Sequence, residues 1–131
     1  MSLSPAPLHT EIANGPDDGR AYWLTTPDGV RIRIGVWGGG DKGTVLLFPG
    51  RTEFVEKYGV TAKGFLERGF STVAIDWRGQ GLADRALDNR LIGHVDDFLD
   101  YQKDVEAVLA ALPDLGPVSY THLTLPTTPY V

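Results

Sequence analysis

Side chains that could act as nucleophiles or bases are few in this chain of 131 residues. Cysteine is absent, which excludes a thiolate nucleophile, a disulfide framework and a cysteine-based zinc site. A serine nucleophile on a sharp strand-to-helix turn requires the pattern Gly-x-Ser-x-Gly, and the sequence does not contain it. Ser71 follows Gly69 by two positions but lacks the second glycine. No catalytic side chain is therefore predicted in this chain, because His9, His94 and His122 have no nucleophile to serve.

Two polar loops follow short apolar runs. The run 44–48 ends at Pro49-Gly50-Arg51-Thr52, and the run 71–75 ends at Asp76-Trp77-Arg78-Gly79. Apolar runs bounded by breakers are typical of strands buried on both faces of a parallel sheet. A helix predicted from Lys57 to Arg68 joins them into a βαβ unit, whose right-handed crossover places both loops at the carboxyl edge of the sheet. Ligands bind at that edge in open α/β sheets, so we expect the site there.

Alternating apolar residues indicate an antiparallel hairpin ahead of these strands. Residues 21–25 and 30–37 flank the turn Pro27-Asp28-Gly29. Residues 1–20 have the turn-forming composition of an irregular segment. Apolar residues recur at intervals of three and four from His94 to Leu112, with Leu99 among them, which predicts an amphipathic helix. The elements together indicate the α/β class.

Other polar clusters admit a metal or cofactor, but we interpret them as structural. Four aspartates could ligate a metal ion, yet they fit a solvated face of the helix expected over 94–112: Asp96, Asp97, Asp100 and Asp104. His94 is interpreted as a structural residue at the start of that helix. The glycine-rich stretch 38–43 precedes a strand, whereas a phosphate-binding loop follows one. We expect no metal site and no cofactor.

Composition excludes further function classes. The net charge of -5 argues against nucleic acid binding, since no basic stripe is present to contact phosphates. The first nine residues have neither a basic cluster nor an apolar segment, and no apolar run is long enough to span a bilayer. We expect a soluble, cytoplasmic protein. Peripheral contact with the inner membrane face is left open for a lipid substrate, and the oligomeric state is not predicted.

The motifs resemble a known family when taken in order. The segments Phe48–Tyr58, Ile75–Gly81 and His94–Tyr101 resemble the amino-terminal part of an α/β-hydrolase. Bacterial lysophospholipases and monoacylglycerol-lipase-like serine hydrolases are the most similar branches, and Pro-Gly-Arg-x-Glu at 49–53 resembles the former. The resemblance covers residues 20–117. It implies a partial α/β-hydrolase fold, with an amino-terminal antiparallel hairpin followed by parallel βαβ units.

The resemblance also implies roles for individual residues. The backbone N–H of Arg51 would be one donor of an oxyanion hole, and the residue after the nucleophile would supply the other. Six residues would form the supporting loops: Pro49, Gly50, Asp76, Arg78, Gly79 and Gly81. Asp76 and Arg78 are expected to brace these loops rather than touch substrate. Ala83 departs from the serine that many relatives carry there, and a plain tight turn remains the alternative for 49–51.

Three functions remain open at this point. The first is the front portion of a serine hydrolase acting on carboxylic esters, with lysophospholipid or monoacylglycerol-type lipids as substrates, this chain itself being inactive. The second is a peptidase or another acyl hydrolase on the same fold. The third is a complete, non-catalytic α/β binding domain. The source gene separates the hydrolases from the binding domain, because a gene that continues into Gly-x-Ser-x-Gly favours a hydrolase.

The chain divides into three parts by sequence: residues 1–20 as the irregular segment, 21–117 as the hydrolase-like part, and 118–131 as a non-native tail. The tail from Val118 to Thr127 resembles a translation of the transposase end of a sequencing-library adaptor, a processing segment to be set apart from the fold. An ordinary polar tail is the alternative. We expect any strand formed by residues 118–122 to pair, poorly, beside Thr44–Phe48.

We predict that the source gene continues past Pro117 with codons that differ from residues 118–131. The continuation should encode an apolar strand and reach Gly-x-Ser-x-Gly within about fifteen residues, since turns between a strand and a helix are short. Amplifying and resequencing the locus measures this directly. Genomic DNA that encodes residues 118–131 without a break would refute it.

Overall fold

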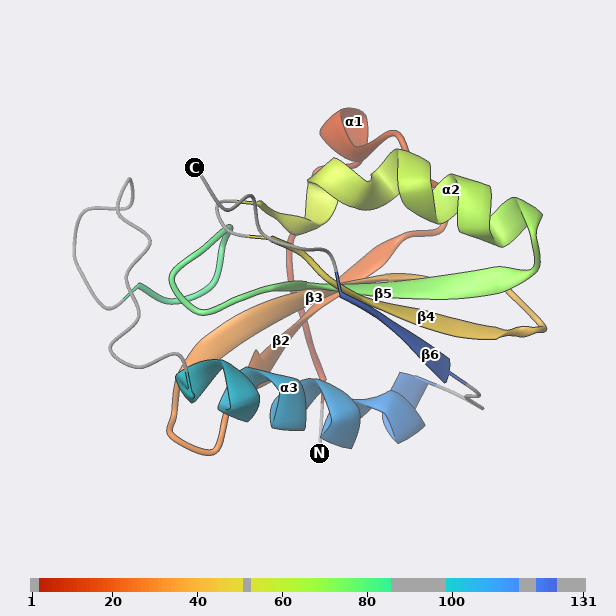
Figure 1. The fold of residues 1–131 in the computed structure, drawn as a ribbon. Coiled ribbons are helices and arrows are strands. Elements are labelled where there is room, and N and C mark those ends of the chain that lie inside the picture. Colours follow the sequence, from red (N-terminus) through yellow and green to blue (C-terminus); the bar gives the residue numbers. More distant parts are fainter. Residues whose placement is uncertain (1–2, 51–52, 86–98, 116–119, 125–131) are drawn as a thin grey trace.

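The computed structural model describes residues 3–50, 53–85, 99–115 and 120–124. Its centre is a six-stranded sheet in the order β1-β2-β3-β5-β4-β6 (Figure 1). The strands are β1 Ser4–Pro5, β2 Arg20–Thr25, β3 Arg31–Trp37, β4 Gly43–Phe48, β5 Phe70–Asp76 and β6 Tyr120–Thr124. Pairing is antiparallel from β1 through β5 and parallel among β5, β4 and β6. The predicted class, with a hairpin followed by parallel strands, is confirmed.

Strand β4 lies inside the parallel part of the sheet. Thr44 pairs with Ser71 of β5 on one side and with Tyr120 of β6 on the other. Continuous burial from Thr44 to Phe48 agrees with the uninterrupted apolar run, since neither face of the strand meets water. The expected pairing of residues 118–122 beside Thr44–Phe48 is confirmed for residues 120–122, and β6 continues this pairing to Thr124; residues 118 and 119 lie outside the described part.

The crossover from β4 to β5 begins with the 3-10 turn η1, Val55–Tyr58, and continues as helix α2, Gly59–Glu67. It occupies the predicted helical segment, although its first turn is tighter than an α-helix. Gly69 ends the segment with a φ of 91°, a left-handed conformation that glycine adopts without steric cost. The backbone N–H of Gly69 donates to the Leu66 carbonyl at 2.9 Å, which caps the helix end.

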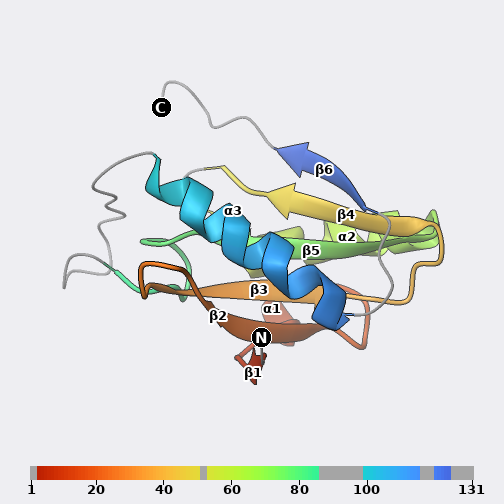
Figure 2. The same ribbon diagram turned by 90° about the horizontal axis from the view of Figure 1, so that it is seen from below.

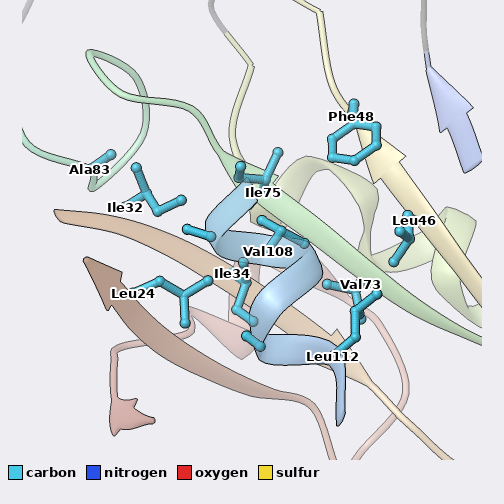
Figure 3. Close-up of a cluster of buried hydrophobic side chains, with 12 residues drawn as sticks. Leu24, Ile32, Ile34, Leu46, Phe48, Val73, Ile75, Ala83, Val108 and Leu112 are labelled. Carbon is cyan, nitrogen blue, oxygen red and sulfur yellow. The ribbon is translucent and has the colours of Figure 1, made fainter. Parts of the chain in front are cut away.

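Helices cover both faces of the sheet. Helix α1, Thr10–Ala13, and α2 lie on one face, and α3, Asp100–Ala111, with the 3-10 turn η2, Leu112–Leu115, lies on the other. Figure 2 shows α3 running across the sheet with α2 behind it. Apolar side chains from four strands converge on Val108 and Leu112 (Figure 3). A second cluster, around Trp37 and Leu47, packs under α1 and α2.

Two details differ from the sequence prediction. Residues 1–20, expected to be irregular, contain β1 and α1, because Ser4 and Pro5 pair with Trp23 and Tyr22 at the sheet edge. Leu99, expected on the apolar face of the last helix, is 71% exposed and precedes α3. The predicted start of that helix at His94 lies outside the described residues.

We predict that Leu46→Ala lowers the free energy of unfolding by about 2 to 5 kcal/mol, the usual cost of removing a buried leucine side chain. Leu46 is 0% exposed at the centre of β4, so its loss leaves a cavity that neighbours fill only in part. Ile12→Ala is the matched control, because Ile12 is 60% exposed and should change stability by less than about 1 kcal/mol. Urea denaturation followed by circular dichroism measures both. Equal losses would contradict this description of the core.

Candidate functional site

The loops that follow β4 and β5 meet at the carboxyl edge of the sheet. The parallel pairing of Leu47 with Ala74 brings the two strand ends side by side. The indole Nε1–H of Trp77 then donates to the Pro49 carbonyl at 2.8 Å. The Trp77 ring also lies 5.6 Å from Phe48 and 5.1 Å from Tyr101, measured between ring centroids. The predicted meeting of the two loops is confirmed for Pro49 and Gly50, while residues 51 and 52 lie outside the described part.

Glu53 holds the first loop from its other end. Its Oε1 accepts the backbone N–H of Gly50 at 2.7 Å and the Tyr58 hydroxyl at 2.6 Å, and its Oε2 pairs with Lys57. Burial acts to raise the pKa of Glu53, but the bonds from Lys57, Tyr58 and Gly50 outweigh it, so the pKa lies below its ordinary value. Burial and the Glu53 carboxylate raise the pKa of Tyr58, which keeps its hydroxyl a donor. Glu53 is therefore an ionised acceptor at neutral pH.

Asp76 ends β5 and is completely buried among donors. Its Oδ2 accepts Arg33 Nε at 2.7 Å and the Leu82 N–H at 3.0 Å, and its Oδ1 accepts the Val55 N–H at 2.8 Å. Burial raises the pKa of the Asp76 carboxyl, against the opposing effects of Arg33 and the two backbone donors. The bonds tie the start of η1 and the loop after β5 to one carboxylate.

The same arginine also binds Glu56. Arg33, 0% exposed, donates to the Glu56 carboxylate at 2.8 and 2.6 Å and to the Pro7 carbonyl at 2.8 Å. Burial acts to raise the pKa of Glu56, but the Arg33 guanidinium and the His9 backbone N–H lower it below the ordinary value. One guanidinium thus joins β3, β5, η1 and the amino-terminal segment.

The loop after Asp76 is shaped by Gly81 and Arg85. Gly81 has a φ of 53°, and a side chain there would place its Cβ 2.2 Å from the Asp76 carboxyl carbon. Only glycine therefore allows the loop to approach Asp76 so closely. The Arg85 guanidinium donates to the carbonyls of Gly79 and Gly81, and these two bonds hold the turn.

Arg78 links the same loop to α3 and to the hairpin turn. Its Nε donates to Asp104 Oδ1 at 2.9 Å, and its backbone N–H donates to Asp104 Oδ2 at 3.0 Å. The two terminal nitrogens of its guanidinium donate to the two carboxylate oxygens of Asp28. The bonds from Arg78 and Thr26 hold the pKa of Asp28 well below its usual range. Asp104 is 0% exposed, so its prediction as part of a solvated helix face is wrong. Asp104 shares the buried face of α3 with Ala107 and Val108, which follow it by three and four positions.

The predicted oxyanion donor, Arg51, lies outside the described residues, as do His94, Asp96 and Asp97. Pro49, Gly50, Asp76, Arg78, Gly79 and Gly81 are all described and gather at the carboxyl edge. Ser71 lies at the opposite end of β5, where its hydroxyl accepts the Gly40 N–H at 2.9 Å. Within the described ranges, no three His, Cys, Asp or Glu side chains are placed to hold a metal ion.

A cavity of about 640 Å³ lies at the other end of the sheet. The connector Gly38–Lys42, the first residues of β4, Ser71 and Leu115 line it. Because ligands bind at the carboxyl ends of parallel strands in this type of sheet, the cavity is not the candidate site. The connector was interpreted as structural from sequence, and its contacts with Gly69 and Ser71 agree with that.

Sequence reasoning missed three residues at this edge: Glu53 and Trp77 as holders of the Pro49–Gly50 turn, and Arg33 as the partner of Asp76. The sequence gives no local signal that Arg33 is buried, since it alternates with apolar residues in β3 in the same way as the exposed Arg31. The partner itself is 43 positions away, and no local pattern identifies it.

Comparison with known proteins gives a family. Residues 39–120, more than half of the chain, match the profile described as serine aminopeptidase, S33. Lysophospholipase L2 of Escherichia coli K12 is 41% identical over 63 residues, which are 48% of this chain and 18% of that protein. The bifunctional esterase/perhydrolase DCH of Acinetobacter calcoaceticus is 33% identical over 102 residues, 78% of this chain and 35% of that protein.

A solved structure shows the same fold. An esterase of Pyrococcus furiosus superimposes with a TM-score of 0.66 at 18% identity, covering 91% of this chain and 45% of its own. The matched part is thus less than half of each of these three proteins. Among the described residues, none of the helices has the length and apolarity to cross a bilayer.

We predict that Asp104→Asn lowers the free energy of unfolding by about 1.5 to 3 kcal/mol, the usual worth of hydrogen bonds to a charged group, because Arg78 loses one of its two carboxylate partners and keeps only Asp28. Asp100→Asn, on the same helix, should cost less than about 1 kcal/mol, since its partner Lys103 is 42% exposed. Denaturant titration of both variants measures the difference. Similar losses would show that the Arg78–Asp104 pair is no more than a surface contact.

Proposed function

The chain belongs to the serine aminopeptidase S33 family within the α/β-hydrolases, and on that premise we propose that it is the front portion of a serine hydrolase that acts on carboxylic esters. Lysophospholipid or monoacylglycerol-type lipids are the substrates that we propose for the whole protein. One observation carries the proposal: the Pro49–Gly50 turn is held at the carboxyl edge of a parallel sheet, within the segment that matches the family.

The names of the relatives support ester chemistry. The Escherichia coli relative is a lysophospholipase, and the Acinetobacter calcoaceticus relative is an esterase and perhydrolase. All of these reactions transfer an acyl group through a tetrahedral intermediate, whose oxyanion requires hydrogen-bond donors. The turn after β4 is the part of this chain that would supply such a donor.

The proposed mechanism assigns this chain half of an oxyanion hole. The backbone N–H of Arg51 would donate to the developing oxyanion, with Pro49, Gly50, Asp76, Arg78, Gly79 and Gly81 supporting the two loops. A serine nucleophile, its base and an acid would come from residues that this sequence does not contain. Removing one oxyanion donor costs about 3 to 4 kcal/mol in the barrier of an intact enzyme. Half a hole without a nucleophile should therefore give almost no turnover, and we propose that residues 1–131 are inactive.

A peptidase is the second candidate, favoured by the description of the matching family as a serine aminopeptidase. Ester and amide hydrolysis share the nucleophile and the oxyanion hole, and they differ in the leaving group that the pocket admits and protonates. Assays with matched ester and amide substrates of the longer protein separate the two.

We propose the same division of the chain as from sequence, with 118–131 as adaptor-derived residues that occupy the place of a native strand beside β4. The pairing of Tyr120–Thr124 with β4 fits this view, because an open strand edge accepts any extended segment. The absence of cysteine suits a reducing compartment, and we propose the cytoplasm, with peripheral contact at the inner membrane face for a lipid substrate.

We predict that the longer protein hydrolyses short-chain acyl esters and is labelled by a serine-directed phosphonate, while residues 1–131 do neither. Both forms should be compared on a chromogenic ester at equal concentration, with lysophospholipid as a second substrate. Replacing the serine of the Gly-x-Ser-x-Gly motif by alanine in the longer protein is the control and should abolish both signals. Turnover by residues 1–131 that is lost on mutating a residue within them would overturn the assignment.

A further inference from the structure

The Pro49–Gly50 peptide group is held at both of its polar atoms by side chains. Pro49 and Gly50 are buried, so the carbonyl and the N–H of the peptide between them both require partners. Trp77 Nε1–H binds the Pro49 carbonyl at 2.8 Å, and Glu53 Oε1 binds the Gly50 N–H at 2.7 Å. Two bonds at opposite ends of one planar group fix the rotation of that plane.

The two side chains are themselves fixed. The Trp77 ring packs between Phe48 and Tyr101, with interplanar angles of 32° and 63°. The Glu53 carboxylate is bound by the Tyr58 hydroxyl at 2.6 Å and by Lys57. Side chains whose own rotamers are locked by packing and hydrogen bonds are what a preorganised site requires. A plain tight turn would need none of these partners.

We propose that Trp77 and Glu53 are positioning residues of the acyl-transfer site, which hold the Pro49–Gly50 peptide and thereby set the direction in which the donor loop leaves β4. This inference rests on the proposed function. Neither side chain touches the reacting atoms; both act through the backbone that carries the donor. The ionised state of Glu53 strengthens its bond to Gly50, since a hydrogen bond to a charged acceptor is stronger than a neutral one.

The first test measures amide hydrogen exchange at Gly50 by NMR in residues 1–131. Glu53→Ala removes the acceptor and should speed Gly50 exchange by about tenfold or more, the effect of losing a charge-assisted hydrogen bond. Trp77→Phe keeps the aromatic contacts but removes the indole N–H, and it should speed exchange at the same amide through the freed carbonyl. Glu53→Gln retains an acceptor oxygen and should stay nearer to the unsubstituted chain.

The second test measures ester hydrolysis by the longer protein. Trp77→Phe and Glu53→Ala should each lower kcat by about 10- to 100-fold with KM nearly unchanged, because a misplaced donor affects the transition state more than substrate binding. Glu53→Gln should recover most of the loss. The double variant should lose less than the product of the single losses, since both residues hold one peptide group.

Matched controls are available elsewhere in the chain. Trp23→Phe changes a tryptophan that stacks on Arg31, and Glu67→Ala changes an exposed glutamate at the end of α2; neither should alter kcat or Gly50 exchange. Unchanged kcat in Trp77→Phe and Glu53→Ala, in an enzyme that hydrolyses esters, would overturn this inference and leave the proposed function intact. A longer protein without hydrolase activity would overturn the proposed function and the catalytic part of the inference, whatever Gly50 exchange shows.

Discussion

The buried guanidinium of Arg33 is the interaction on which the carboxyl edge of the sheet depends. Taking a charge out of water is costly, and the cost is offset only where opposite charges and hydrogen bonds surround it closely. Arg33 donates to Asp76 and Glu56 within 2.8 Å, and the backbone N–H groups of Val55, Leu82 and His9 donate further hydrogen bonds to these two carboxylates. An arrangement of the strands that separated Arg33 from Asp76 and Glu56 would leave buried charges without partners. The network therefore selects this arrangement more than it adds net stability.

A second network of charged side chains, on the other face of the sheet, also joins distant segments of the chain. Arg78, just past β5, joins Asp104 of α3 to Asp28 of the hairpin turn. The two arginines lie on opposite sides of the sheet, and each connects the antiparallel hairpin to the loop that follows β5. The hairpin is far from these loops in sequence, yet it sets their position.

The pattern of apolar residues made the strands and helices predictable, but it did not predict the polar contacts between them. Continuous runs at 44–48 and 71–75 identified β4 and β5, because burial on both faces leaves no alternation to misread. Asp104 was assigned to a solvated face because a carboxylate on a helix usually faces water. Only the tertiary fold reveals its buried partner, Arg78. Leu99 was misassigned because periodicity does not reveal where a helix begins. Long-range pairing of charges depends on the tertiary fold, and one sequence contains no local signal for it.

The hydrogen bonds that hold the two loops at the carboxyl edge come from one stretch of the chain. The residues that hold the Pro49–Gly50 peptide, and those that hold the loop after Asp76, all lie between Asp28 and Asp104. None of these bonds requires a nucleophile, a base or an acid. The Pro49–Gly50 peptide is thus held by side chains of this stretch alone. On the proposed function, such rigidity matters because a donor that is already in position stabilises a transition state without reorganising at the moment of reaction.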